Sequence, residues 1–273
     1  MIIVKNLSFN YKDKQIFNDL NFEISMGKWV SVIGDNGSGK TTLVKILIGL
    51  LRQNQGQIFI NGKELTENNL FELRTSMGIV FQNPDYQFVG YDVENDIAFG
   101  LENRLLSREE MKQKINKYSR MFNIQHLLSS KPNELSGGQK QKVAIASVLA
   151  MNPEIIIFDE PTSFLDPQSS QEIFNIIQTI HKQKDKILIT ITHDLSFALK
   201  SDEIMILDEG NLIKKEASSN LLKDMSFINK HFEHLPLGLK LYYELEKIKD
   251  LSGINLKKTR ELQDFLWQYN LKM

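Results

Sequence analysis

The sequence predicts an α/β fold built around a parallel sheet, and three observations point to it. Residues 154–160 (EIIIFDE) and 186–194 (KILITITHD) each contain a short, continuous apolar run, which is typical of parallel strands covered on both faces. A stretch with helical character, residues 168–184, separates the two runs. Earlier, residues 30–50 pass from an apolar run through a glycine-rich loop into apolar residues with helical spacing. Strands that alternate with helices in this way predict an α/β core.

The amino-terminal part is expected to consist mainly of strands. Residues 2–11 and 20–34 carry alternating or continuous β-branched and apolar residues, broken by polar turns such as KDKQ. A buried helix is predicted over 43–51, and a short strand (GQIFING) ends in the Asn-Gly turn at 61–62. The segment 77–85 is then a strand that runs into a proline-containing loop.

The rest of the chain changes character twice. Residues 93–150 are rich in charged side chains, with Leu, Ile and Met at helical spacing, so a helical segment broken at Pro132 is expected. A closing hairpin is predicted around 209–211. The last fifty residues carry two apolar helical faces, which either pack on the chain's own core or form a dimer contact. The first face consists of Leu237, Leu241, Leu245 and Ile248, and the second of Leu262, Phe265, Leu266 and Tyr269.

The composition is that of an ordinary globular protein without a strong charge bias. Of the 273 residues, 41% are hydrophobic and 25% are charged, and the net charge is −1. We therefore expect no nucleic-acid partner, because such proteins usually carry a basic excess. The chain has no cysteine, which excludes disulfides, thiolate metal sites and cysteine catalysis. No apolar stretch reaches the roughly 18 residues needed to cross a bilayer, and we expect no signal peptide.

The glycine-rich loop carries the strongest chemical signal. Gly34, Gly39, Lys40 and Thr41 fit the pattern G-x-x-x-x-G-K-[ST], between a predicted strand and a predicted helix. Its glycines let backbone N–H groups approach phosphate oxygens, and the helix adds its positive N-terminal end. Lys40 is expected to reach the terminal phosphates and the Thr41 hydroxyl to bind Mg²⁺. The alternative is a glycine-rich turn without a ligand.

An acidic pair follows the apolar run 155–158. Asp159 and Glu160 stand where a parallel strand ends, which is the edge at which open α/β sheets bind ligands. Asp159 is placed to hold Mg²⁺ through its water shell, and Glu160 to polarise the water that attacks the γ-phosphate. The alternative is an acidic turn after a strand, which is common for either residue alone.

Two further features complete the set. The segment LSGGQ, residues 135–139, opens a helix with Ser136 and two glycines and forms a second anion-binding nest, which suits the nucleotide of a neighbouring molecule. His193 ends the apolar run at 187–192 and could reach a γ-phosphate from the same edge of the sheet. The remaining histidines lack partners at metal-ligand spacing and are interpreted as surface or structural residues, with the run HKQKDK as a solvated helix end. They are His126, His181, His231 and His234.

Six motifs, in this order, resemble the ATP-binding cassette (ABC) ATPases over about residues 1–225. They are the phosphate loop at 34–42, Gln82, the LSGGQ signature, the acidic strand end, the segment SFLD at 163–166, and His193. The resemblance implies the P-loop NTPase (Walker A) fold of that family. Its parts are a RecA-like mixed sheet core, an antiparallel β subdomain, a helical signature subdomain at about 93–150 and, here, a small helical extension at 226–273.

The family also implies how such a site is assembled. Two nucleotide-binding domains form a head-to-tail dimer, and each ATP lies between the phosphate loop of one and the signature of the other. Tyr11 matches the aromatic residue that stacks on adenine, Gln82 the residue that senses Mg²⁺ and the attacking water, and Asp166 the residue that couples the two halves. Phe164 replaces the usual small residue, which affects packing across the dimer rather than the chemistry. The resemblance implies three catalytic residues, Glu160, His193 and Gln82. The implied Mg²⁺ ligands are Thr41, Gln82 and Asp159. The implied ATP-binding residues are Tyr11, Gly34, Asn36, Gly37, Ser38, Gly39, Lys40, Thr41, Thr42, Ser136, Gly137, Gly138 and Gln139.

Residues 81–103 (FQNPDYQFVGYDVENDIAFGLEN) carry a narrower resemblance, to the ATPase subunits of energy-coupling factor (ECF) transporters, most of all to the first of their two paralogous ATPases. The resemblance implies two ATPases on the cytoplasmic face of the cell membrane, a transmembrane coupling subunit and a membrane subunit that captures vitamins or related micronutrients, or cobalt or nickel ions. Tyr86 and Tyr91–Asp92 depart from the typical residues without disturbing the frame. Asp85 and Glu94 are candidates to dock an arginine of the coupling subunit, and a solvated acidic loop is the alternative.

Two other functions stay open from the sequence. A soluble ABC ATPase of DNA repair or translation would usually carry two cassettes, a long coiled-coil insertion or basic arms. The ATPase of an ordinary binding-protein-dependent importer is disfavoured by the segment 81–103. Whether the partner ATPase is identical or a paralogue cannot be read from these motifs, because both would carry them.

Overall fold

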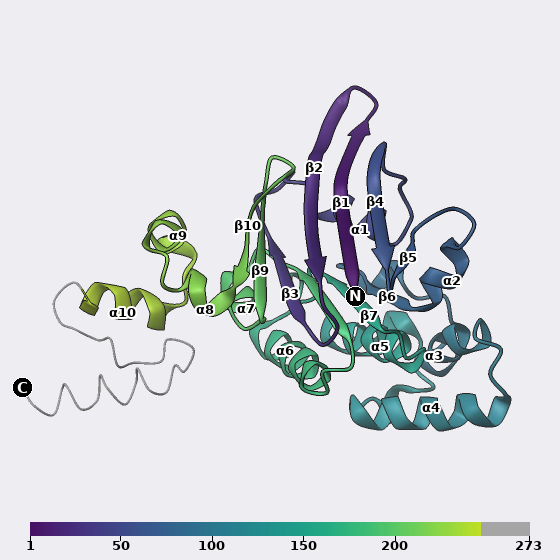
Figure 1. The fold of residues 1–273 in the computed structure, drawn as a ribbon. Helices are drawn as coiled ribbons and strands as arrows, with labels where there is room; N and C mark the ends of the chain where they lie inside the picture. The colour runs from purple at the N-terminus through teal and green to yellow at the C-terminus, as the bar shows by residue number, and fades with distance from the viewer. Residues whose placement is uncertain (247–273) are drawn as a thin grey trace, which may run out of the picture.

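The computed structural model describes residues 1–246, which form two sheets with helices around them (Figure 1). The strands are β1 (Ile2–Tyr11), β2 (Lys14–Ile24), β3 (Trp29–Ile33), β4 (Gln55–Ile60), β5 (Lys63–Glu64), β6 (Met77–Val80), β7 (Ile155–Asp159), β8 (Ile187–Ile191), β9 (Glu203–Asp208) and β10 (Asn211–Ala217). The α-helices are α1 (Lys40–Leu47), α2 (Leu70–Thr75), α3 (Val93–Glu102), α4 (Arg108–Met121), α5 (Gly137–Ala150), α6 (Pro167–Lys182), α7 (Leu195–Ala198), α8 (Ser218–Leu221), α9 (Met225–His231) and α10 (Leu237–Glu246). The 3-10 helices are η1 (Pro84–Tyr86), η2 (Gln125–Leu127), η3 (Pro132–Glu134) and η4 (Phe232–His234). In this part of the chain, no helix is both long and apolar enough to span a membrane.

The larger sheet is mixed, as the resemblance to ABC ATPases implies, whereas the apolar runs alone predicted a parallel sheet. Its strand order is β10-β9-β3-β8-β7-β6, and all neighbours pair in parallel except β10 and β9. The smaller sheet has the order β2-β1-β4-β5 and is antiparallel. The carboxyl ends of β3, β7 and β8 therefore meet at one edge of the larger sheet, where the sequence places its candidate residues.

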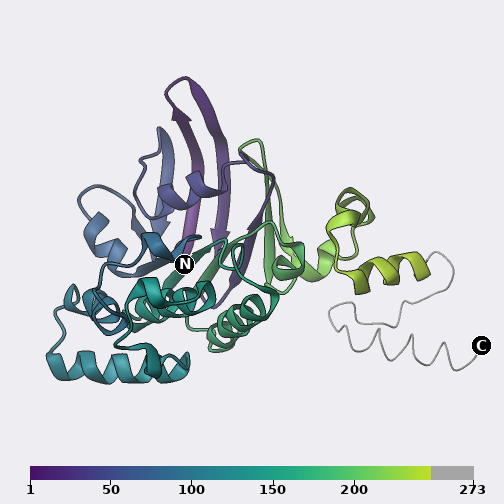
Figure 2. The same cartoon turned by 180° about the vertical axis from the view of Figure 1, so that it is seen from behind.

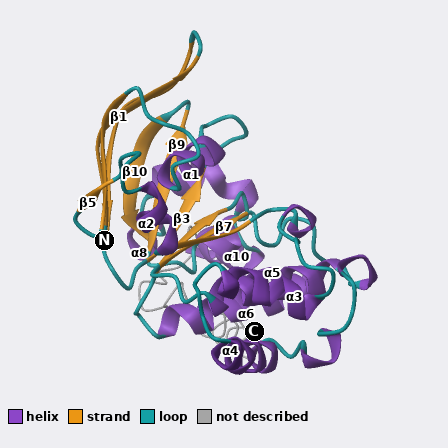
Figure 3. Cartoon of the chain, turned by 90° about the vertical axis from the view of Figure 1, so that its right-hand side faces the viewer, coloured by secondary structure: helices purple, strands orange, loops and turns teal. Residues whose placement is uncertain are grey.

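The larger sheet is covered on both faces, which explains its uninterrupted apolar runs. Along β7, Ile155 and Ile157 face a core that includes α1 and the antiparallel strands. Their neighbours Ile156 and Phe158 face a second core, built with residues of α3, α4, α5 and α6. Figure 3 shows these four helices gathered on one side of the chain, away from β1 and β5. Both faces of β7 are thus buried, so every position from Ile155 to Phe158 is apolar rather than every second one.

The predicted helical segment and the predicted turns are confirmed. Residues 93–150 contain α3, α4 and α5, and Pro132 begins a short 3-10 helix between the last two. Asn61 and Gly62 have φ values of 50° and 81° and join β4 to β5, as expected for an Asn-Gly hairpin turn. The short helix α2 was not predicted, because six residues are too few to show a helical period.

The carboxy-terminal helices form a third core beside β9 and β10. Figure 2 shows α9 and α10 projecting from that edge of the molecule. Leu239, Tyr242 and Tyr243 of α10 are buried, whereas Leu237 and Leu241 are 73% and 42% exposed. Packing of the first predicted apolar face on the chain's own core is therefore wrong for these two leucines. Ile248 of the first predicted face and the whole second face, at 262–269, lie outside the described residues.

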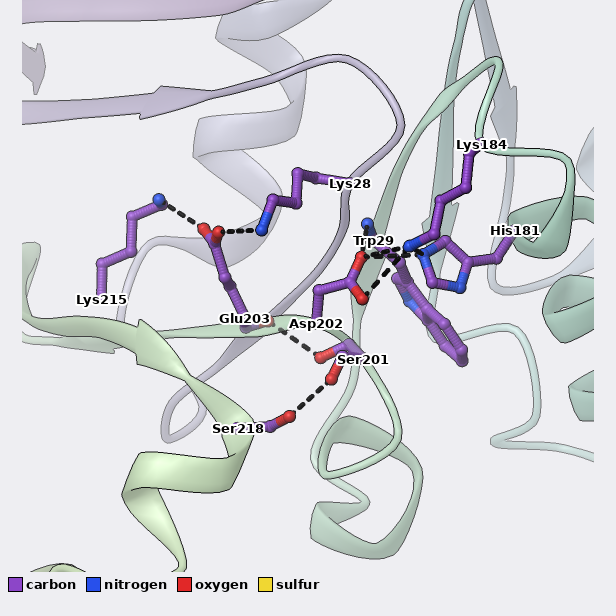
Figure 4. Close-up of polar contacts among 9 residues, drawn as sticks. All are labelled: Lys28, Trp29, His181, Lys184, Ser201, Asp202, Glu203, Lys215 and Ser218. Carbon is purple, nitrogen blue, oxygen red and sulfur yellow. Dashed lines mark hydrogen bonds and ion pairs between the residues drawn. The ribbon is translucent and has the colours of Figure 1, made fainter. Parts of the chain in front are cut away.

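A polar cluster closes the opposite edge of the larger sheet (Figure 4). The carboxylate of Asp202 accepts the backbone N–H of Trp29 at 3.0 Å, contacts His181 Nε2 at 2.7 Å and pairs with Lys184 Nζ at 3.2 Å. We call these four residues the Asp202 cluster. Burial raises the pKa of Asp202, but the hydrogen bonds from Trp29, His181 and Lys184 outweigh it and leave the pKa below its usual range. The interpretation of this helix end as solvated is wrong for His181, which is 13% exposed and structural.

The same edge also ties the carboxy-terminal part to the sheet. Glu203 pairs with Lys28 at 3.0 Å and with Lys215 at 2.5 Å (Figure 4). The Ser218 hydroxyl, at the start of α8, donates to the Ser201 carbonyl at 2.5 Å. Two segments of the chain, one at Lys28 and one at 215–218, are therefore fixed beside the beginning of β9.

The tip of the β9–β10 hairpin packs against the other end of the sheet. The Gly210 N–H donates to the Ser38 carbonyl at 3.2 Å. Gly210 has φ +79°, and a Cβ there would lie 1.6 Å from the carbonyl oxygen of Ile16. Only glycine fits this approach, and the contact joins the hairpin tip to the glycine-rich loop.

Candidate nucleotide-binding site

The predicted phosphate loop connects β3 to α1, as the sequence requires. Gly39 is the N-cap residue of α1 with φ 103°, a conformation that favours glycine. A Cβ on Gly39 would lie 2.7 Å from the Phe17 ring. The loop is thus packed closely against β2 at Gly39. Ser38 is buried in the loop, and its hydroxyl has no hydrogen-bond partner among the described residues.

Lys40 occupies the centre of the loop. Its ammonium donates to the carbonyl oxygens of Gly34 at 2.7 Å and Asp35 at 2.9 Å. Burial lowers the pKa of Lys40, and the carboxylates of Glu160, Asp35 and Asp159 act in the opposite direction. The loop therefore presents a positive charge that its own carbonyls hold in place.

A cleft of about 330 Å³ opens in front of the loop and collects most of the predicted residues. Sequence reasoning did not identify Lys14, Ile16 and Ile191, which also line it. Tyr11 does not line it: its ring is 41% exposed and rests edge-on against Phe9, across the hairpin from Lys14. The predicted residues that line the cleft are Asn36, Gly37, Gly39, Lys40, Thr41, Thr42, Gln82, Asp159 and Glu160.

The acidic pair lines this cleft, and His193, which is not among the lining residues, contacts Glu160. Burial, and then the charge of Glu160, raise the pKa of Asp159. Glu160 Oε2 lies 2.9 Å from His193 Nδ1 and accepts the Ser163 hydroxyl at 2.7 Å. The backbone N–H of Glu160 donates to the Ile191 carbonyl at 2.9 Å, so β7 and β8 stay joined beyond their ends. Sequence reasoning placed Glu160 and His193 together but gave Ser163 no role of its own.

The LSGGQ signature lies outside the cleft. Ser136 is the N-cap residue of α5: its hydroxyl accepts the Gln139 N–H at 3.3 Å, and its own N–H donates to Gln139 Oε1 at 2.8 Å. Gly138 is buried, and a Cβ there would lie 2.5 Å from the Ser169 hydroxyl. This helix N-terminus is exposed at Ser136 and Gly137 and contributes no residue to the lining of the cleft.

A second hollow, of about 270 Å³, links the glutamine loop to the signature. Gln82 lines both this hollow and the cleft. Phe164, which is 71% exposed, also borders it. Asp166 is the N-cap residue of α6 and accepts the backbone N–H and hydroxyl of Ser169 at 2.9 and 2.6 Å. These hydrogen bonds, led by that from the Ser169 hydroxyl, lower the pKa of Asp166.

Hydrogen bonds within the segment 81–103 and from it to α5 explain several of its residue types. Asp96 is buried and accepts the N–H groups of Val89 and Gly90 at 2.9 and 3.2 Å and the Ser147 hydroxyl at 3.0 Å. A Cβ on Gly90 would lie 2.2 Å from the Asp96 nitrogen. Gln87 donates to the Ala144 carbonyl at 3.0 Å. The segment is thus clamped to α5, the helix that carries the signature.

The two docking candidates differ in their surroundings. Asp85 is half exposed and pairs with Lys140 Nζ at 2.6 Å, so it is already bound within the chain. Glu94 is exposed in the first turn of α3. Tyr86 and Tyr91 nearby are 82% and 71% exposed. The docking role of Asp85 and Glu94 stays a prediction.

Together, the loop, the lysine and the acidic strand end define a P-loop nucleotide-binding protein, and comparisons with known proteins agree. The ABC transporter family model matches residues 17–163. The energy-coupling factor transporter ATP-binding protein EcfA of Onion yellows phytoplasma is 55% identical over the whole of both chains. EcfA1 of Streptococcus pneumoniae is 40% identical over 98% of each chain.

Solved structures show the same architecture. CbiO1 from Clostridium perfringens, part of the ABC transporter complex CbiONQ, superposes with a TM-score of 0.78 at 32% identity, over 89% of this chain and 98% of that one. A dimeric ATP-binding cassette in a post-hydrolysis state with ADP and Pi gives a TM-score of 0.71 at 28% identity, over 80% of this chain and 99% of that one. The ABC ATPase fold predicted from the sequence is confirmed.

The chain belongs to the ABC transporter family and, within it, to the ATP-binding proteins of energy-coupling factor transporters. It is therefore a nucleotide-binding ATPase whose activity is coupled to transport.

Proposed function

We propose that this chain binds ATP in the cleft in front of the phosphate loop and hydrolyses it only when the signature of a second ATPase subunit covers the nucleotide. The observation that carries the proposal is the separation of the two anion-binding elements. Lys40 and Thr41 line the cleft, whereas Ser136 opens an exposed helix end elsewhere on the chain. Because Ser136 does not line the cleft that contains Lys40 and Thr41, a head-to-tail pair of subunits would bring the two elements together on one nucleotide.

Within the cleft, the phosphate-binding roles fall to the loop. The backbone N–H groups between Gly34 and Thr42 would hold the phosphate oxygens, and Lys40 would leave its carbonyl partners to reach the terminal phosphates. Tyr11 would stack on adenine after turning from Phe9. Ser136, Gly137, Gly138 and Gln139 would complete the site from the second subunit.

The residues of the cleft also fit Mg²⁺. Thr41, Gln82 and Asp159 offer a hydroxyl, an amide and a carboxylate oxygen, which are the hard ligands that this ion prefers. Mg²⁺ usually keeps several water ligands and takes the others from one or two carboxylates and from substrate phosphates. When bound, Mg²⁺ would neutralise charge that develops on the phosphate oxygens.

The hydrolytic step is assigned to Glu160. In that step the water oxygen bonds to the γ-phosphorus, a water proton passes to Glu160, and the bond to the bridging oxygen of ADP breaks. His193 lies against Glu160 and would reach the γ-phosphate from the same side. Closure by the second subunit would add donors and exclude water, which strengthens each of these interactions. Asp166 would couple the two halves of the dimer when they close.

The partners follow from the branch of the family. The second ATPase would be a paralogue or a second copy, and Asp85 and Glu94 would lie where the transmembrane coupling subunit docks. The ATPase would sit on the cytoplasmic face of the cell membrane. Together with a substrate-capturing membrane subunit, the complex would take up vitamins or related micronutrients, or cobalt or nickel ions.

Two substitutions in the complex assembled with its transporter subunits test the proposal. Glu160→Gln should keep ATP binding and lose turnover, because an amide cannot take the proton. Ser136→Phe should keep ATP binding by the isolated chain but block turnover, because the side chain fills the second subunit's half of the site.

Ser107→Phe is the matched control, since Ser107 caps α4 through the same kind of capping box. It should lose the cap and retain turnover. Normal ATPase activity of Glu160→Gln would overturn the assigned base. Normal activity of Ser136→Phe would overturn the shared site.

A further inference from the structure

The turn after β7 contains a hydroxyl that the roles assigned so far do not use. Ser163 Oγ donates to Glu160 Oε2 at 2.7 Å, and His193 Nδ1 lies 2.9 Å from the same oxygen. Among the described residues, no hydrogen bond or ion pair is made to Oε1. The two contacts therefore fix the carboxylate by one oxygen and leave the other for a ligand.

The backbone makes this arrangement specific. Glu160 has φ +46°, in the left-handed region, so its side chain leaves the strand in a direction that β structure does not give. The Ser163 N–H donates to the Glu160 carbonyl at 3.2 Å, which closes a turn and brings the hydroxyl back to the carboxylate. The Leu165 N–H donates to the Thr162 carbonyl at 3.2 Å, so the following residues continue the turn.

The two donors differ in how firmly they are held. The His193 side chain is 69% exposed, whereas that of Glu160 is 13% exposed. An exposed ring has many positions open to it, and a nucleotide γ-phosphate would compete for its N–H. Ser163 is only partly exposed and is held to Glu160 by both a backbone and a side-chain hydrogen bond. When His193 turns to the nucleotide, the serine hydroxyl is the remaining contact that keeps the carboxylate oriented.

We propose that Ser163 is a positioning residue for ATP hydrolysis: it holds Oε2 of Glu160 so that Oε1 faces the attacking water. The inference rests on the role of Glu160 proposed above and extends it to the turn that carries Phe164 and Asp166. Without this contact, the Glu160 carboxylate would still permit nucleotide binding. It would point at the attacking water in a smaller fraction of the bound complexes, so kcat would fall.

The test compares four variants in the assembled complex, with kcat and KM for ATP measured separately. Ser163→Ala should lower kcat about tenfold, the effect of losing one hydrogen bond to a charged group, and leave KM within about twofold. Ser163→Thr keeps a hydroxyl and should restore most of kcat. Ser163→Cys keeps the shape but donates weakly, so it should resemble the alanine variant. Ser170→Ala, a change of the same kind on α6 where the hydroxyl makes only contacts of 3.5 Å, should behave like the wild type.

A double-mutant cycle separates this inference from the proposed function. In a Glu160→Gln background, Ser163→Ala should lower the residual turnover no further, because the serine acts through the carboxylate. If Glu160→Gln is inactive while Ser163→Ala and Ser163→Cys keep the wild-type kcat, the positioning role is wrong and the base assignment stands. The positioning role is also wrong if Ser163→Ala loses kcat/KM only through a higher KM. It is equally wrong if the kcat of Ser163→Thr is no higher than that of Ser163→Ala. If Glu160→Gln turns over normally, both fall.

Discussion

Replacing Asp202 by alanine should destabilise the fold by about 3 kcal/mol. The substitution removes two contacts to a charged acceptor in poorly solvated surroundings, each worth about 1.5 kcal/mol or more. One is the N–H of Trp29, a residue with 0% exposure, at 3.0 Å, which would be left unpaired. The other is His181, 13% exposed, at 2.7 Å. The pair with Lys184, which is 53% exposed, adds little because solvent screens it.

Thermal unfolding of the full chain measures this effect. For a chain of this size, about 3 kcal/mol corresponds to a fall in Tm of roughly 6–12 °C. Lys184→Ala is the control, and should lower Tm by no more than about 2 °C because the exposed pair contributes little. If Asp202→Ala unfolds within about 2 °C of the wild type, the cluster does not hold the start of β3 to the end of α6. A large fall in Tm for Lys184→Ala would contradict the argument that exposed contacts of Asp202 stabilise the fold less than buried ones.

Two further predictions concern the cleft and the loop beside it. Burial and the charge of Glu160 raise the pKa of Asp159, so this carboxyl group takes up its proton at a higher pH than an ordinary aspartate, whose pKa is about 3.9. Because Mg²⁺ needs the ionised carboxylate, Mg²⁺-dependent ATP affinity should begin to fall at that higher pH as the pH is lowered. Binding titrations from about pH 7 to pH 4 check this, and a flat affinity over that range would refute it. Asp96→Ala should leave the N–H groups of Val89 and Gly90 unpaired and cost about 2–3 kcal/mol. Hydrogen exchange of residues 83–90 should speed up while ATP binding persists, and unchanged protection would contradict the clamp.

The nucleotide cleft was largely predictable because its signals are local. A glycine-rich loop between a strand and a helix, and carboxylates at a strand end, are determined by residues next to each other in the chain. The parallel sheet then brings the ends of β3, β7 and β8 to one edge, as the order of the motifs requires. Lys40, Asp159 and Glu160 consequently line one cleft, although more than a hundred residues separate the first from the others.

Other features depend on contacts that sequence patterns do not reveal. His181 meets Asp202 only because α6 ends beside the start of β9, so a histidine in a charged run looked solvated. On α10, leucine spacing pointed to Leu237 and Leu241, but the buried face is built from Leu239 and two tyrosines. Tyr243 can be buried because its hydroxyl donates to the Leu222 carbonyl, a partner that the sequence cannot supply.

Hairpin tips ordinarily accept extra residues or a tag, because their backbones face only solvent. The β9–β10 tip is different, since Gly210 rests on the Ile16 carbonyl and bonds to Ser38. A residue added at 209–211 would push on the glycine-rich loop, which we propose binds the phosphates. We therefore expect insertions and reporter tags to be tolerated better in other turns, because this hairpin supports the proposed ATP site from behind.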